Sequence, residues 1–178
     1  MSTTQDAPVL DRVRELFITG LKNAHGLEKQ ALSIMEPQVA RIEHYPEVAE
    51  KLRSHIDETH GQIRRLDEIM SDLDESGSTF KDMTMSMGGS MAAIAHSFAG
   101  DEIIKNSIAN FAFENYEIAS YTALIALAEE GFSSAVSLLE QTLDEERRMA
   151  EWIEQSLPKV TRRYAGLSAE QGSFTAKS

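Results

Sequence analysis

Apolar side chains recur at every third or fourth position in four long segments of the chain, the spacing that gathers them on one face of an α-helix. The first segment extends from about Leu10 to Met35, and Pro37 just after it predicts a stop or a bend. The second covers about Glu47 to Leu73, with Pro46 suited to its first turn. The short connection between these two segments predicts an antiparallel pair of helices.

A second pair of helices is predicted after a long, methionine-rich connection. The third segment covers about residues 101–130, and Gly131 predicts its end. The fourth covers about residues 133–157, and Pro158 predicts its end. The connection includes KDMTMSMGGSMAAIAHSFAG and is interpreted as a crossover that is helical in part and interrupted by its Gly-Gly pair.

No alternation typical of β-strands competes with these helical patterns. The predicted fold is therefore all-α, a four-helix bundle of two antiparallel hairpins joined by a long, partly helical crossover. Residues 1–8 are expected to form a loose leader, residues 9–157 the bundle, and residues 158–178 a partly disordered tail of low apolar content.

Composition narrows the classes of function. The formal net charge of −12 over 178 residues argues against binding to nucleic acid, which requires a basic surface, and against binding to anionic membranes. The chain has no cysteine, no apolar run of transmembrane length and no pattern of a secretory signal at its start. We therefore expect a cytoplasmic protein without thiol chemistry.

Each of the four segments places at least one glutamate on or beside its apolar face, where a charged side chain is unexpected. Isolated buried carboxylates are costly and clustered ones repel each other, so several in one small bundle need a common cause. A pair of divalent cations removes both costs, and carboxylate-bridged di-iron and di-manganese sites are built from glutamates on separate bundle helices. The candidate metal ligands are Glu28, Glu58, Glu114, Glu117 and Glu146.

Other candidate ligands leave two readings open. His55 lies on the inner side of the second segment and is either a ligand or a hydrogen-bonded core histidine. Glu58 lies at the border of the apolar face, so an ordinary solvent-facing glutamate is its alternative. His25, His60 and Gln62 are weaker candidates, chosen for their spacing from acidic residues.

Four blocks of the chain resemble a known family: LKNAHGLEKQAL, HIDETHGQIRRLDEIM, FENYEIASYTALIALAEEGF and LLEQTLDEERRMAEWI. They are similar to the bacterial stress-associated YciF/YciE proteins of the ferritin-like superfamily, over about residues 9–157. The resemblance implies a bundle related to rubrerythrin, two iron or manganese ions and a homodimer. The carboxylates of that family fall on the same five glutamates.

The resemblance also carries expectations of function. It implies stress-related oxidoreductase chemistry on peroxide or dioxygen, with electrons from an external donor because the chain has no cysteine. The alternative is a non-catalytic stress protein, a helical dimer that acts through storage, sequestration or a partner. The chain has Asn115 and Gln62 where many members have histidine, and Ala150 where they tend to have aspartate, which implies a site with fewer ligands.

Overall fold

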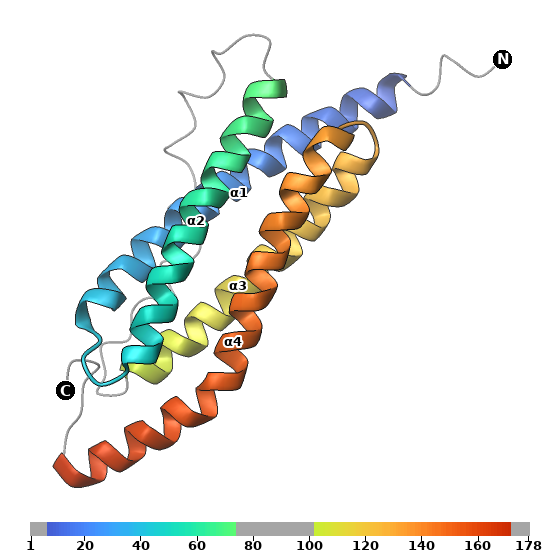
Figure 1. The fold of residues 1–178 in the computed structure, drawn as a ribbon. Coiled ribbons are helices and arrows are strands. Elements are labelled where there is room, and N and C mark those ends of the chain that lie inside the picture. Colours follow the sequence, from blue (N-terminus) through green and yellow to red (C-terminus); the bar gives the residue numbers. More distant parts are fainter. Residues whose placement is uncertain (1–6, 74–101, 172–178) are drawn as a thin grey trace.

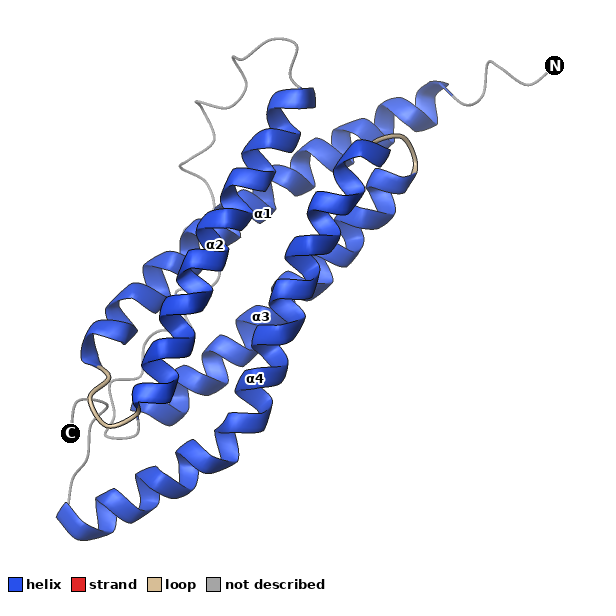
Figure 2. Ribbon diagram, viewed as in Figure 1, coloured by secondary structure: helices blue, strands red, loops and turns tan. Residues whose placement is uncertain are grey.

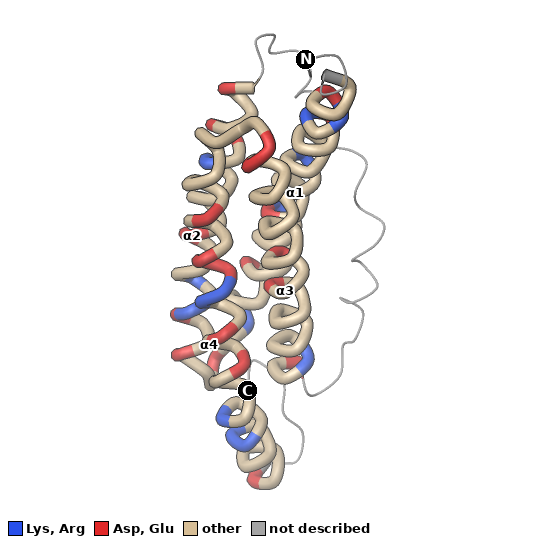
Figure 3. Tube along the Cα trace, turned by 90° about the vertical axis from the view of Figure 1, so that its right-hand side faces the viewer, with Lys and Arg blue, Asp and Glu red and all other residues tan. Residues whose placement is uncertain are grey.

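The computed structural model describes residues 7–73 and 102–171, which form four α-helices, with a short turn after the first helix and another after the third (Figures 1, 2 and 3). No strand occurs in these two ranges. The predicted all-α four-helix bundle is thereby confirmed. The helices are α1 (Ala7–Arg41), α2 (Pro46–Leu73), α3 (Glu102–Glu129) and α4 (Ser133–Gln171).

The helices form two antiparallel hairpins that pack side by side (Figure 1). Helix α1 contacts α2 and α3, and α4 contacts α3 and α2, so the four helices enclose one common core. None of these helices is both long enough and apolar enough to cross a lipid bilayer. The predicted crossover and its Gly-Gly pair, like most of the leader, lie outside the described residues.

Helix α1 continues past Pro37, where the sequence predicts a stop or a bend. A proline inside a helix removes one hydrogen bond and costs about 3 kcal/mol. Contacts beyond the proline offset that cost: Gln38 is buried against α3, and Arg41 Nε donates a 2.7 Å hydrogen bond to Glu102 Oε1. Tertiary packing therefore extends α1 to Arg41.

Helix α4 does not end at Pro158 as predicted but continues to Gln171, so residues 158–171 are helical. The helix bends in its last third (Figure 1), as expected for an internal proline. The extension is held by buried Val160 and by Arg163, whose guanidinium lies 5.5 Å from the centroid of the Tyr45 ring. The low apolar content of this segment gave no indication of these few contacts in the sequence.

The core is divided into two apolar clusters by a layer of polar side chains. One cluster surrounds Phe17, near the turn between α3 and α4, and includes the stacked pair Phe17–Phe132. The other surrounds Tyr45, near the turn between α1 and α2. Between them every helix contributes buried polar groups, here called the polar layer: Glu28, His55, Gln62, Glu114, Glu117 and Glu146.

A second buried polar contact, between Gln38 and Asn110, fixes the register of α1 against α3. Each amide donates to the other, at 3.2 Å from Gln38 Nε2 and 2.9 Å from Asn110 Nδ2. Removing one partner leaves the other buried without a hydrogen bond, at a cost of about 1–3 kcal/mol.

We expect Gln38→Ala to lower the free energy of unfolding by about 1–3 kcal/mol, measured by urea denaturation. The double variant Gln38→Leu, Asn110→Leu removes both polar groups and is expected to recover most of that loss. Equal losses in the single and double variants would contradict this role of the amide pair.

Candidate metal centre

The polar layer brings at least one carboxylate or imidazole from each helix to the middle of the bundle. Glu28 comes from α1, His55 from α2, Glu114 and Glu117 from α3, and Glu146 from α4. Each of the five residues is at most 3% exposed to solvent. The helical phase had predicted the inward direction of Glu28, Glu114, Glu117 and Glu146.

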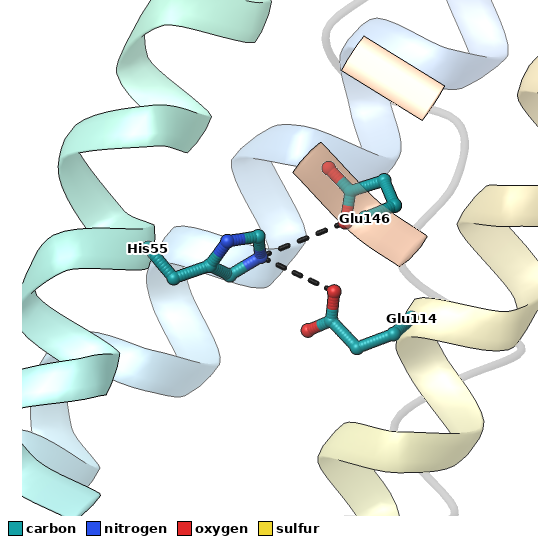
Figure 4. A group of neighbouring side chains, drawn as sticks. All are labelled: His55, Glu114 and Glu146. Atoms are coloured by element: carbon teal, nitrogen blue, oxygen red, sulfur yellow. Dashed lines mark ion pairs between the residues drawn. The ribbon is translucent and has the colours of Figure 1, made fainter. Parts of the chain in front are cut away.

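His55 is the centre of the contacts in this layer (Figure 4). Its Nε2 lies 3.2 Å from Glu114 Oε2 and 3.6 Å from Glu146 Oε2. Its Nδ1 lies 3.0 Å from Glu58 Oε2, so each ring nitrogen faces a carboxylate. His55, Glu114 and Glu146 each offer one ligand atom, and these atoms all lie within 4.8 Å of one another.

On the other side of the layer, around Glu28 and Glu117, the polar groups offer only oxygen atoms. The Tyr121 hydroxyl donates a hydrogen bond to Glu28 Oε1. Glu117 is buried, and its charge adds to the effect of burial, which is the main cause that raises the pKa values of Glu146 and Tyr121. Oxygen ligands of this kind suit hard cations, whereas the histidine side adds one nitrogen.

Burial and mutual repulsion make these carboxylates weak acids. Burial raises the pKa of Glu28 to about 7, against the opposing hydrogen bond from Tyr121. Burial, followed by the charges of neighbouring glutamates, raises the pKa of Glu117 and of Glu146 well above the usual range. Without a cation, these three glutamates therefore retain their protons to a higher pH than exposed carboxyl groups do.

The same surroundings favour the charged form of the His55 imidazole. Burial alone would lower the pKa of His55, but the carboxylates of Glu114 and Glu58 outweigh it and raise the pKa to about 9. The hydrogen bond to His55 lowers the pKa of Glu58. His55 thus serves as an internal cation for the surrounding acids when no metal is bound.

Four carboxylate oxygens of the layer are buried without a hydrogen bond: Glu28 Oε2, Glu114 Oε2, Glu117 Oε1 and Glu146 Oε2. The oxygens of Glu114 and Glu146 are those that face His55 Nε2, whereas no polar contact compensates the other two. Such atoms are rare in folded proteins because each one lacks the compensation that water would give. They converge from three helices on one place and belong to a residue type that ligates iron, manganese and other hard cations. The residues present therefore fit a metal site.

The other predicted ligands lie around this group rather than within it. Glu58 is partly exposed, with 27% of its side chain accessible, and holds the Nδ1 side of His55. Gln62 is buried and donates from Nε2 to Glu146 Oε1. His25 lies 3.2 Å from Asp67 Oδ1, with its pKa lowered chiefly by burial, and His60 is exposed on α2.

The three positions at which the chain departs from the family that it resembles do not affect the candidate site equally. Asn115 lies on the exposed face of α3 and donates to the backbone oxygen of Phe111, so it does not remove a ligand from the layer. Ala150 is buried one turn after Glu146, where a carboxylate would have been near the site. Gln62 also faces the layer, and its neutral amide stands where a histidine would have offered a nitrogen ligand.

Sequence reasoning missed Glu145, which is buried beside Glu146 on α4. Arg65 of α2 donates to Glu145 Oε2 and compensates its charge. The sequence did contain a signal, namely two consecutive acidic residues at the inner edge of α4 and two consecutive basic residues on α2. That signal does not tell which members meet across the bundle.

Comparison with known proteins places this chain in a family. The chain is 32% identical to protein YciF of Escherichia coli K12 over 147 residues, covering 76% of this chain and 84% of the relative. A crystal structure from Xanthomonas campestris pv. campestris is 30% identical with a TM-score of 0.73, covering 90% of this chain and 99% of the other.

The crystal structure of the E. coli stress protein YciF has a TM-score of 0.70 at 27% identity, covering 84% of this chain and 97% of that one. Residues 12–166 match the family described as "Domain of unknown function (DUF892)". The predicted YciF-like relationship is thereby confirmed. The chain belongs to the DUF892 family and is a homologue of the stress protein YciF.

Proposed function

We propose that this chain is a metal-binding stress protein that holds two iron or manganese ions in its polar layer and supports oxidoreductase chemistry on peroxide or dioxygen. The observation that carries the proposal is the set of four buried carboxylate oxygens that make no hydrogen bond, two of which face His55 Nε2. Hydrophobic residues would fill the centre of a purely structural bundle at lower cost. Similarity to a protein named for stress supports the physiological setting.

The residues divide into two groups of ligands. His55, Glu114 and Glu146 would hold one ion, and Glu28 and Glu117 would contribute to the second. When Glu58 accepts the proton of Nδ1, Nε2 of His55 is left free to bind a metal.

Iron or manganese, when bound, supplies the electron transfer that protein side chains cannot supply. The apolar clusters on both sides exclude bulk water from the layer. Tyr121 orients Glu28 through its hydroxyl. Since the chain has no cysteine to bind an iron–sulfur or rubredoxin-type centre, the reducing electrons must come from another molecule.

Anaerobic loading with iron(II), followed by addition of hydrogen peroxide, tests this function. We expect a spectral change and consumption of peroxide in proportion to bound iron, with repeated turnover when a reductant is supplied. Tyr121→Phe serves as a comparison, because it removes the hydroxyl on Glu28 while keeping the ring. A loaded protein that leaves peroxide and dioxygen unchanged would contradict the redox part of the proposal.

A second candidate is storage or sequestration of metal without turnover. It is favoured by the single histidine in the layer and by the apolar side chain of Ala150 near Glu146. Bound metal that is retained through cycles of peroxide addition, with no substrate consumed, is the result expected for this candidate.

A further inference from the structure

A largely buried ion pair lies directly beside the polar layer and takes no part in the proposed ligand set. It joins Arg65 of α2 to Glu145 of α4, with side chains 13% and 9% exposed. Arg65 Nε also donates a 3.0 Å hydrogen bond to Thr142 Oγ1, which fixes the guanidinium against α4. A buried pair of this kind contributes little net stability compared with apolar residues, so its position calls for another reason.

Gln62 links this ion pair to the candidate metal ligands. Its Nε2 lies 3.2 Å from Glu145 Oε2 and also donates to Glu146 Oε1. Glu145 Oε2 therefore accepts from Gln62 and from Arg65 at the same time. Only the side chains of Gln62 and Glu145 link the guanidinium of Arg65 to Glu146.

An arginine so close to a cation site competes with the cation. Its permanent positive charge would neutralise the same carboxylates and repel an incoming divalent ion. Glu145 cancels that charge and holds the guanidinium on the outer side of Gln62. Adjacent helix positions point about 100° apart, so Glu145 faces Arg65 while Glu146 faces the layer.

We propose that Glu145 is a positioning residue that holds Arg65 away from Glu146 and thereby keeps the carboxylates of the polar layer available to divalent cations. The inference rests on the proposed metal site. It adds that α4 uses two consecutive glutamates for opposite tasks, with Glu146 facing the cations and Glu145 balancing the arginine.

The test is the affinity of the full chain for Mn²⁺, measured by calorimetry on metal-free protein. Glu145→Gln keeps the shape but leaves Arg65 uncompensated, and we expect it to weaken Mn²⁺ binding about tenfold or more. Arg65→Met alone is expected to bind at least as tightly as the unmodified chain. The double variant restores charge balance and is expected to return to within about threefold of the unmodified affinity.

Arg64→Met and Glu140→Gln are matched controls, because both residues are exposed on the same two helices. Neither control is expected to change the affinity. Unfolding midpoints of the metal-free variants distinguish a positioning role of Glu145 from a purely structural one. If the substitutions only damaged packing, their losses of stability would add up in the double variant rather than cancel.

Two results would overturn the inference alone: Mn²⁺ affinity unchanged in Glu145→Gln, or a double variant as weak as Glu145→Gln. Absence of Mn²⁺ and iron(II) binding in the unmodified chain would instead overturn the proposed metal site, and this inference with it.

Discussion

Replacement of Glu28 and Glu146 together by alanine is expected to weaken the binding of iron(II) or Mn²⁺ by more than about 100-fold. Each of the two residues supplies a buried carboxylate oxygen that makes no hydrogen bond, and they come from opposite hairpins of the bundle. Their loss leaves neither half of the layer with its full set of carboxylates. Even residues that only orient metal ligands cost about 10–100-fold when replaced, so two ligands should cost more.

The same substitution has a second expected effect, which distinguishes loss of a ligand from loss of the fold. Without metal, the variant should be about as stable at neutral pH as the unmodified chain, because the removal of two costly buried acids offsets the hydrogen bonds that Tyr121 and Gln62 lose. With metal at about 100 times its dissociation constant, only the unmodified chain should gain about 2.7 kcal/mol. Thermal unfolding with and without metal measures both effects.

Glu36→Ala, Glu140→Ala is a suitable control, since it removes one exposed glutamate from α1 and one from α4. It should leave both affinity and stability nearly unchanged. Equal loss of metal binding in the control and in the inner variant would contradict a site in the polar layer.

The metal-free protein is expected to lose stability as the pH rises from about 4.5 to 9. The pKa of Glu28 rises from 4.5 to about 7 on folding, so this residue makes the folded chain bind more protons than the unfolded chain between about pH 4.5 and 7. Its stability must then fall with increasing pH, by about 3 kcal/mol for this residue. The raised pKa values of Glu117 and Glu146 act in the same direction.

His55 extends this loss to higher pH. Its pKa is raised from 6.5 to about 9 on folding, so its stabilising contribution is complete below pH 6.5 and disappears as the pH rises through 9. Urea unfolding of metal-free protein from pH 5 to pH 9 measures the combined effect. The variant Glu28→Gln should flatten the profile between about pH 4.5 and 7, and a stability that increases from pH 5 to 8 would contradict the prediction.

The fold and the inward glutamates could be predicted because both follow from local periodicity. Residues three or four positions apart share a helix face, which fixed the direction of Glu114 and Glu117 without knowledge of any partner. The ends of α1 and α4 could not be predicted in this way. Pro37 and Pro158 are local stop signals, but they are overruled by contacts with α3 and Tyr45 from distant parts of the chain.

The arrangement of the candidate site depended on information that one sequence does not contain. Glu58 was predicted as a ligand, but it lies at the edge of its helix face and holds His55 instead of joining the group with Glu114. Glu145 was missed because its partner Arg65 lies on another helix, and the register between α2 and α4 decides which charges meet. Helix phase gives the direction of a side chain, whereas pairing across helices is a tertiary property.

The central claim is that cations bind among the acids in the middle of the bundle. A crystal of the protein soaked with Mn²⁺, with diffraction recorded near the manganese absorption edge, tests it most directly. We expect an anomalous peak within coordination distance of His55, Glu114 and Glu146, and a second one beside Glu28 and Glu117. A map with no peak in this layer, or with peaks only at surface carboxylates, would contradict the claim.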